Sequence, residues 1–305
     1  MQTHTPNALT DALPQEELFF DRPMSAYTTI KVGGPAAMMM EAHSAQQVAR
    51  AIQAARQRGI PTLLLGNGSN LLMDDAGFDG LVIRFGEAFS QVKLEGNTLT
   101  AQAGASLMAL SRLTVEHSLA GLEFAAGIPA SLGGAALMNA GAYGGEMAHV
   151  IRHVDCLDPQ GRAVRLQVKD IGYGYRDSRM MREGYTVLSA CMELKPGDGE
   201  AIRRCVQENQ MHRRNKQPLT YPSAGSFFKR PPGYFAGALI EQAGLKGCRR
   251  GAAQVSELHA GFLINLGGAT GQDFRSLVAH VQDTVEQRSG VWLEPEVRII
   301  GRRGA

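Results

Sequence analysis

A glycine-rich stretch from Gly121 to Gly145, GLEFAAGIPASLGGAALMNAGAYGG, constrains this chain more than any other part of its sequence. Six glycines fall between Gly127 and Gly145, and Glu123 is the one charged residue of the stretch. Glycine lets a backbone approach a ligand closely, and successive N–H groups can face an anion such as phosphate. The apolar residues between the glycines indicate burial: Ile128, Leu132, Ala135, Ala136, Leu137 and Met138. We therefore predict a buried wall against a large phosphorylated ligand; the alternative is a tightly packed turn system without a ligand.

A second glycine-rich segment, Gly66-Asn67-Gly68-Ser69-Asn70, directly follows an expected buried strand at 62–65. Its glycines give access to the backbone, and its short polar side chains can hydrogen-bond to oxygen atoms. The segment is not a P-loop, because no lysine follows at the required spacing, and it is not GxGxxG, because Leu71 replaces the third glycine. We predict a phosphate-binding loop, with an ordinary turn as the alternative.

Composition excludes several classes of function. The net charge of +2 gives no reason to expect nucleic acid or a membrane surface as a partner. No apolar run approaches the roughly 20 residues of a membrane span, and no secretion signal is recognisable, so we expect a cytoplasmic protein. The four cysteines form no CxxC pair, and neither HExxH nor GxSxG occurs, so we expect no disulfide framework, no metal site and no serine-hydrolase elbow.

Hydrophobic periodicity and capping signals predict an α+β chain in two parts, divided near Lys195–Gly199. Helices are expected at 44–59, with Ser44 and Gln47 as a capping box, at 106–120, 201–211 and 234–243, and at 270–290 with Thr270 and Asp273 at its start. Strands are expected at 28–32, 37–42, 62–65, 81–83, 98–103, 150–157 paired with 163–168, 185–194 and 261–265. A final strand is expected at 291–300, interrupted by Glu294-Pro295-Glu296.

A few polar residues stand out as candidates for chemistry. Arg176 lies among glycines and tyrosines in GYGYRDS, which suits a cation directed at a ligand carboxylate, although a surface arginine is the alternative. Ser226 follows Gly225 between prolines, where a turn serine that bonds its own backbone is the alternative. We expect Glu294 to be solvated and His259 to be a structural hydrogen-bonding residue.

Seven stretches, in order, resemble the UDP-N-acetylenolpyruvoylglucosamine reductase (MurB) family of flavoenzymes. They span roughly Thr28 to Gly301 and read TTIKVGGPA, LLLGNGSNLL, GIPASLGGAALMNAGAYGGE, GYGYRDS, QPLTYPSAGSFFKRP, SELHAGFLIN and LEPEVRIIG. Each stretch alone is weak evidence, whereas the ordered set is specific.

The resemblance implies an FAD-binding module of the vanillyl-alcohol-oxidase (PCMH) type, followed by an α+β substrate-binding domain. We expect a lead-in at 1–20, the FAD module at 21–200 with subdomains at about 21–86 and 87–200, and the substrate domain at 201–305. The family's reaction reduces UDP-N-acetyl-3-O-(1-carboxyvinyl)glucosamine to UDP-N-acetylmuramate for peptidoglycan synthesis, with non-covalent FAD and with NADPH as hydride donor. A monomer is expected.

The matching motifs also imply roles for individual residues. Arg176 would stabilise negative charge in the transition state, Ser226 would donate the proton, and Glu296 would be the third active-site residue. The implied substrate contacts are Tyr175, Lys216, Lys229 and Arg230. The implied FAD contacts are Gly66, Asn67, Gly68, Ser69, Asn70, Gly127, Ile128, Pro129, Ser131, Gly133, Gly134, Asn139, Gly141 and Ala142.

Two positions depart from the family pattern. Ala130 replaces a common glycine, which FAD binding should tolerate if φ at this residue is negative, and Arg230 replaces an asparagine found in some members. The lack of a long insert after GYGYRDS indicates the shorter form of the family.

Two alternatives to this function remain. One is another flavoprotein oxidase of the same fold, for which His149 or His153 would be the flavin tether, and the other is a non-catalytic flavin-binding module.

Overall fold

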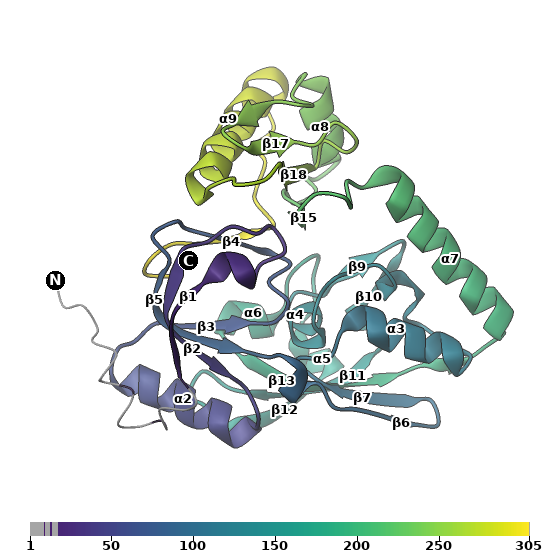
Figure 1. Ribbon diagram of the computed structural model, residues 1–305. Helices are drawn as coiled ribbons and strands as arrows, with labels where there is room; N and C mark the ends of the chain where they lie inside the picture. Colours follow the sequence, from purple (N-terminus) through teal and green to yellow (C-terminus); the bar gives the residue numbers. More distant parts are fainter. Residues whose placement is uncertain (1–8, 10–12, 14–17, 305) are drawn as a thin grey trace. The chain divides into compact units, whose positions relative to one another are not determined.

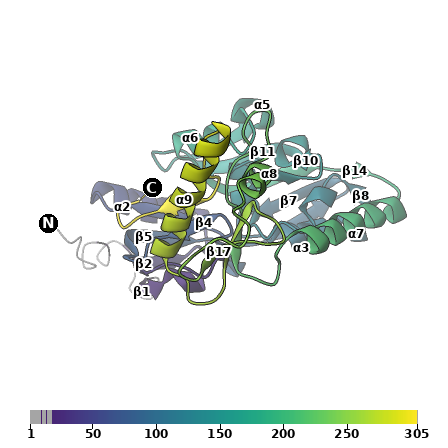
Figure 2. The same ribbon diagram turned by 90° about the horizontal axis from the view of Figure 1, so that it is seen from above.

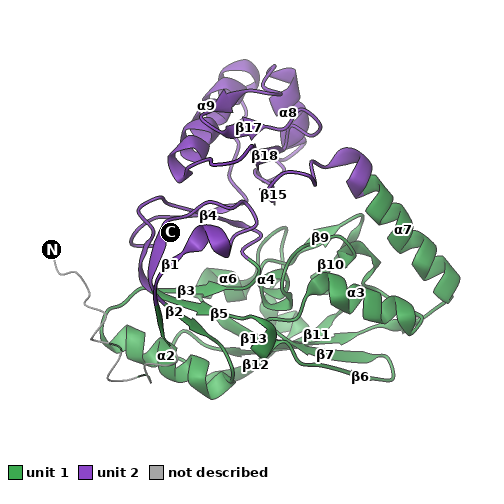
Figure 3. Cartoon of the chain, in the orientation of Figure 1, with its two compact units in different colours: residues 1–19, 39–67, 81–212 green, residues 20–38, 68–80, 213–305 purple. Residues whose placement is uncertain are grey.

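The computed structural model describes residue 9, residue 13 and residues 18–304, so most of the expected lead-in at 1–20 lies outside the described residues. The chain forms two compact units, neither of which is continuous in sequence (Figure 3). The first unit comprises residues up to 19 together with 39–67 and 81–212. The second comprises 20–38, 68–80 and 213–305.

A five-stranded antiparallel sheet forms the centre of the first unit, in the order β12-β11-β13-β7-β6 (Figure 1). Its strands are β6 (Val92–Glu95), β7 (Thr98–Gln102), β11 (Ile151–Leu157), β12 (Ala163–Gln167) and β13 (Thr186–Glu193). The predicted pairing of 150–157 with 163–168 is confirmed, because Leu157 faces Ala163 and His153 faces Gln167. The turn between them is held by Asp158, which accepts hydrogen bonds from the backbone N–H groups of Gln160 and Arg162.

The helices of the first unit begin at capping residues that the sequence identifies. The side chain of Ser44 caps α2 (Ala45–Gln57), and Ser106 caps α3 (Leu107–Glu116). The predicted capping box at α2 is wrong in one detail, because the Gln47 side chain accepts the N–H of His43 rather than that of Ser44. A helix that the sequence did not predict, α4 (Leu132–Leu137), is capped by Ser131 and packs on β13 and β7.

Shorter elements complete the first unit. The strand β3 (Thr62–Leu65) runs parallel to the end of β5 (Phe78–Arg84). The remaining short elements are β8 (Leu119–Ala120), β9 (Gly141–Ala142), β10 (Gly145–Glu146), β14 (Lys195–Pro196), α5 (Val168–Ile171), α6 (Arg179–Glu183), and the 3-10 turns η3 (Glu87–Phe89), η4 (Glu123–Ala125) and η5 (Met147–His149). The strands β1 (Phe19–Pro23), β2 (Pro35–Glu41) and β5 and the helix α7 (Gly199–Lys216) are each divided between the two units.

The second unit has a four-stranded antiparallel sheet in the order β15-β18-β17-β16. Its strands are β15 (Ser223–Ser226), β16 (Arg249–Arg250), β17 (Ala253–Val255) and β18 (Phe262–Asn265). The helices α8 (Ala236–Gln242) and α9 (Gly271–Ser289) lie side by side (Figures 1 and 2), and α9 packs on β16 and β17. Their contact buries Ile240, Phe274 and Leu277 completely. Elsewhere in this unit, η2 (Met24–Ala26) precedes β4 (Leu71–Met73) and its parallel partner β19 (Arg298–Ile300).

The start of α9 shows how local sequence defines an element. The Thr270 side chain accepts the N–H of Asp273, and the Asp273 side chain accepts the N–H of Thr270, which completes a capping box. Gly290 ends the helix with φ of 71°, a left-handed conformation that glycine adopts without steric cost. The predicted limits of this helix are confirmed.

One predicted strand is wrong, and another is wrong in part. Residues 28–32 form a turn, because Lys31 has φ of 59° and the Thr28 hydroxyl donates to the Val32 carbonyl at 2.9 Å. The strand expected at 291–300 is interrupted at Pro295 as predicted, since proline lacks an N–H for a regular ladder, but only Arg298–Ile300 is a strand and the part before Glu294 is not. The expected division near residue 200 falls at the start of α7, whereas the units divide within this helix, after His212. No helix among the described residues is long and apolar enough to cross a bilayer.

Candidate functional site

Arg176 lies in the first unit, in a tight turn where Gly174 and Asp177 pair across the bend. Its backbone has φ of 52°, an uncommon conformation for a residue with a long side chain. Its guanidinium group donates from Nη2 to the Gly141 carbonyl at 2.7 Å and from Nη1 to the Asn139 carbonyl at 3.3 Å. Two bonds to backbone oxygen atoms therefore fix the direction of the side chain.

Further contacts join the same two segments, 137–141 and 174–178. The Asn139 amide donates from Nδ2 to the Gly174 carbonyl at 3.0 Å, and the Ser178 hydroxyl donates to the Leu137 carbonyl at 2.5 Å. We call these four hydrogen bonds, which join the two segments, the arginine clasp. The clasp joins two motifs that the sequence shows only as separate stretches, the glycine-rich wall and GYGYRDS.

The glycine-rich wall has a buried side and an exposed side. Three of its apolar residues are fully buried, namely Leu132, Ala135 and Ala136. Pro129 and Gly134 are exposed. The prediction that the whole segment is buried is therefore wrong in part, and the remaining apolar members, Ile128, Leu137 and Met138, are half-buried. The short helix α4 separates the two sides, so its exposed side is the one available to a ligand.

Gly133 is explained by packing rather than by ligand access. Its N–H donates to the Ala103 carbonyl at 2.8 Å, and a Cβ at this position would lie 2.8 Å from the Cβ of Ala103. At the next residue, Gly134, a Cβ would meet only the Ser131 hydroxyl oxygen, at an ordinary 3.6 Å. Gly133 is therefore required by packing against Ala103, whereas packing within the protein does not require a glycine at position 134.

This difference predicts opposite outcomes for two alanine substitutions. Both gain about 1 kcal/mol of helix propensity, but Gly133→Ala also overpacks α4 against Ala103. Because overpacking costs about 1–3 kcal/mol, we expect Gly133→Ala to be less stable than Gly134→Ala by that amount. Urea denaturation of the full-length variants measures the difference, and equal free energies of unfolding would contradict the packing explanation.

The first two residues of the loop at 66–70, Gly66 and Asn67, lie beside the wall within the first unit, and the loop continues into the second unit at Gly68. A Cβ on Gly66 would lie 2.0 Å from the Ser131 hydroxyl oxygen, and the Asn67 amide donates to the Pro129 carbonyl at 3.2 Å. The backbone N–H groups of four successive residues, 66–69, donate to no other residue that the structure describes. A run of unpaired N–H groups with a left-handed residue, here Gly68 at φ of 62°, suits a diphosphate such as that of FAD.

Ala130, the departure from the family pattern in this wall, is compatible with its backbone. Ala130 does not have a positive φ, so its methyl group causes no backbone strain. Its carbonyl accepts the N–H of Leu107, the first residue of α3, at 3.0 Å.

Ser226 and Glu296 lie on neighbouring backbone segments of the second unit. The N–H of Glu296 donates to the carbonyl of Phe227 at 2.8 Å, and the Glu296 carbonyl accepts the side-chain amide of Asn70 at 3.1 Å. Ser226 is exposed at the end of β15, and its hydroxyl hydrogen-bonds to none of the other described residues. The structure thus brings two of the three predicted catalytic residues together.

Two of the three predicted cations of the second unit, Lys229 and Arg230, have partners of their own. Glu294 is exposed, as expected, and its carboxylate contacts the Lys229 ammonium at 2.6 Å. The Arg230 guanidinium lies 4.0 Å from the ring centroid of Phe235, and its Nε donates to the Tyr234 carbonyl at 3.3 Å. Lys216 is the last residue of α7.

Two models of protein families match the chain. One, described as an FAD-binding domain, matches residues 35–167, and the other, described as UDP-N-acetylenolpyruvoylglucosamine reductase, C-terminal domain, matches residues 217–300. A protein named UDP-N-acetylenolpyruvoylglucosamine reductase from Clostridium perfringens is 46% identical over 288 residues, which are 94% of this chain and 94% of the relative. The chain belongs to the UDP-N-acetylenolpyruvoylglucosamine reductase family.

Other relatives agree with this assignment. A reductase of the same name from Streptococcus agalactiae is 46% identical over 93% of this chain and 95% of its own length. The crystal structure of the reductase of this family from Thermus caldophilus matches with a TM-score of 0.81 and 36% identity, over 93% of this chain and 98% of that chain. The predicted family, the α+β fold class and the FAD-binding module are therefore confirmed, whereas the roles of individual residues stay predictions.

Sequence reasoning missed Tyr173, in the same turn as Arg176. Burial raises the pKa of its phenol, and its hydroxyl has no hydrogen-bond partner among the described residues. The position of Tyr173 inside GYGYRDS was the available signal.

The prediction for His259 is confirmed, because its Nδ1 accepts the N–H of Gly261 at 3.1 Å, and burial lowers the pKa of its imidazole.

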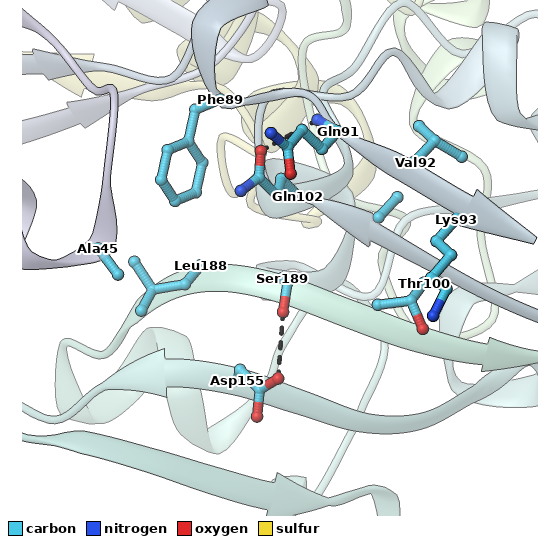
Figure 4. Close-up of a pocket in the computed structure, with 11 residues that line it drawn as sticks. Ala45, Phe89, Gln91, Val92, Lys93, Thr100, Gln102, Asp155, Leu188 and Ser189 are labelled. Atoms are coloured by element: carbon cyan, nitrogen blue, oxygen red, sulfur yellow. Dashed lines mark hydrogen bonds between the residues drawn. The ribbon is translucent and has the colours of Figure 1, made fainter.

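A pocket of about 370 Å³ lies elsewhere in the first unit of this reductase-family protein (Figure 4). It is lined by Ala45, Phe89, Gln91, Val92, Lys93, Thr100, Ala101, Gln102, Asp155, Leu188 and Ser189. Successive side chains along β7 and the residue after it, Ala103, lie on opposite faces of the sheet. Ala103 contacts α4 at Gly133, so Thr100 and Gln102 lie on the opposite face of the sheet from α4. None of the lining residues is a predicted site residue, so the pocket lies outside the predicted FAD and substrate contacts.

Proposed function

We propose that this protein reduces UDP-N-acetyl-3-O-(1-carboxyvinyl)glucosamine to UDP-N-acetylmuramate, a step in the synthesis of peptidoglycan precursors. The observation that carries the proposal is 46% identity over 94% of the chain with a reductase of that name. The protein is an FAD-dependent oxidoreductase that uses NADPH. Bound FAD supplies the two-electron chemistry that links oxidation of NADPH to reduction of the enolpyruvyl double bond.

The exposed side of the wall and the loop at 66–69 are the proposed FAD contacts. The four unpaired N–H groups of that loop are donors for the FAD diphosphate. Gly134, on the exposed side of α4, leaves space for the cofactor, whereas Gly133 and the buried Asn139 contribute through packing and hydrogen bonds within the protein.

Arg176 has the role of stabilising charge. Addition of hydride to the terminal carbon of the double bond places negative charge on the adjacent carbon, and the charge spreads into the substrate carboxylate. A guanidinium group that is already fixed by the Asn139 and Gly141 carbonyls need not reorganise when this charge develops. Such preorganised electrostatic stabilisation is the largest contribution in many enzymes.

Ser226 is the proposed proton donor to that adjacent carbon. Its hydroxyl is exposed, so it can turn toward a substrate without breaking a bond within the protein. The carbanion is a strong base, so a correctly placed hydroxyl suffices as the acid, and solvent then restores the serine proton. We assign Glu296 to the same site, since its backbone is fixed beside Phe227, the residue after Ser226.

The remaining assignments concern binding and context. Tyr175, which is exposed and whose ring centroid lies 5.2 Å from the Arg176 guanidinium carbon, is a proposed substrate contact, as are Lys216, Lys229 and Arg230. A nucleotide-sugar substrate and NADPH are both consistent with the proposed cytoplasmic location. A monomer in solution is part of the proposal, and light scattering measures it.

The proposal is tested by turnover with the purified, FAD-loaded protein. NADPH consumption is followed by absorbance, and the sugar nucleotides are followed by mass spectrometry. We expect one UDP-N-acetylmuramate to form for each NADPH consumed. Oxygen uptake with peroxide formation, without dependence on the sugar nucleotide, would instead support the flavoprotein oxidase alternative. FAD binding without NADPH consumption would support the non-catalytic module.

A further inference from the structure

Asn139 uses both ends of its side-chain amide within the protein. Its Nδ2 donates to the Gly174 carbonyl at 3.0 Å, and its Oδ1 accepts the N–H of Ala148 at 2.9 Å. The residue is only 1% exposed. Its carbonyl oxygen is also engaged, because it accepts the Arg176 Nη1 donor. The side-chain groups and the carbonyl of Asn139 are thus already occupied by protein.

Asn139 also has φ of 50°, a left-handed conformation that asparagine tolerates better than most residues. This conformation directs its carbonyl to Arg176 while its side chain reaches Gly174 in the same turn. One residue therefore holds the Arg176 turn at two points, once through its backbone and once through its side chain.

The Arg176 turn needs such support. An arginine at φ of 52° is in a sparsely populated conformation, which persists only where the surrounding structure enforces it. The turn is otherwise closed by two mutual hydrogen bonds between Gly174 and Asp177, at 3.0 and 3.4 Å. Without the Asn139 amide, the Gly174 carbonyl keeps only the long 3.4 Å bond from the Asp177 N–H, so the turn is less restrained and the guanidinium group can move.

We propose that the Asn139 side chain positions Arg176, acting through the Gly174 carbonyl, and does not bind the flavin. The kinetic part of this proposal rests on the proposed function, since Arg176 acts on the substrate carboxylate. The structural part does not, because it concerns the order of the Arg176 turn in the protein without substrate.

Asn139→Gly is the principal variant, since glycine retains the left-handed backbone and removes only the amide. The matched control is Asn97→Gly, which removes another side-chain amide that donates to a backbone carbonyl, that of Leu194 at 3.1 Å. We expect Asn139→Gly to slow reoxidation of the reduced flavin by substrate about 100-fold, the effect of a displacement near 1 Å. Flavin content and reduction by NADPH should stay within about twofold of wild type, and Asn97→Gly should match wild type in all three.

Asn139→Asp separates the two ends of the amide, because it keeps an acceptor for Ala148 and removes the donor to Gly174. We expect it to slow reoxidation at least as much as Asn139→Gly. Combination of either variant with Arg176→Ala should add no further slowing, since Asn139 acts through Arg176. The proposal would be overturned if the Asn139 variants slow flavin reoxidation equally in the presence and absence of the Arg176 guanidinium. It would also be overturned if flavin content, or the rate of flavin reduction by NADPH, falls as much as the rate of reoxidation.

Hydrogen exchange on the FAD-loaded protein tests the positioning role without substrate. The amides of Gly174 and Asp177 should exchange faster in Asn139→Gly than in wild type, and they should exchange at the wild-type rate in Asn97→Gly. Unchanged exchange in Asn139→Gly would overturn the proposal even if reoxidation of the flavin is slowed. If exchange is faster in Asn139→Gly but the wild-type protein does not reduce the sugar nucleotide, the positioning role is supported and the proposed function is wrong.

Discussion

Replacement of Ser226 by alanine should leave reduction of the flavin by NADPH intact and should slow its reoxidation by the enolpyruvyl substrate about 10²–10⁴-fold, the usual contribution of a positioned acid. The two half-reactions separate because the proton is needed only when the double bond is reduced. The exposed hydroxyl makes no bond to another described residue, so its removal leaves no protein group unsatisfied. Anaerobic rapid-mixing absorbance measures each half-reaction.

Ser223→Ala is the matched control for this prediction. Ser223 begins the same strand, β15, and its substitution removes the same hydroxyl group. We expect this variant to reoxidise at nearly the wild-type rate. Wild-type reoxidation in Ser226→Ala would remove Ser226 from the proposed mechanism, and equal slowing in both variants would indicate an effect on the strand rather than on proton transfer.

Replacement of Arg176 by alanine should also spare flavin reduction by NADPH and should slow reoxidation about 10²–10³-fold, as the loss of one preorganised charge-stabilising group does. Arg176→Lys should recover little of this rate. An ammonium group lacks the planar fork that bonds two carbonyls at once, and here those carbonyls belong to Asn139 and Gly141.

Arg179→Ala is the control for the loss of a positive charge in the same region. Arg179 is paired with Glu183 at 2.9 Å on α6, and none of the predicted roles belongs to it. We expect it to reoxidise like wild type. If Arg176→Ala reoxidises as fast as Arg179→Ala, the charge-stabilising role of Arg176 is wrong.

Elements with strong local signals could be predicted from the sequence. The helix α9 has a complete capping box at Thr270, a regular apolar period and a terminal glycine, so each local signal indicates the same structure. The segment at 28–32 shows the opposite case. Its β-branched residues favour a strand, but the Thr28 hydroxyl bonds the Val32 carbonyl and closes a turn, a competition that propensity alone does not resolve.

The site was predictable in its motifs but not in its contacts. Two glycine-rich segments indicated a phosphorylated ligand, and the family resemblance supplied the reaction and the three catalytic candidates. The arginine clasp was not predictable, because Arg176 and Asn139 are 37 positions apart and only the tertiary fold brings them together. For the same reason Asn139 and Gly133 were predicted as flavin contacts, whereas the structure gives both residues partners within the protein.

The account's central claim is that electrons pass from NADPH through bound FAD to the enolpyruvyl sugar nucleotide. The most direct test reduces the FAD-loaded protein with NADPH in the absence of oxygen, adds the sugar nucleotide and follows the flavin absorbance. The account predicts a rapid return of the oxidised spectrum, with UDP-N-acetylmuramate as the product. A flavin that stays reduced with this substrate and reoxidises only when oxygen is admitted would contradict it.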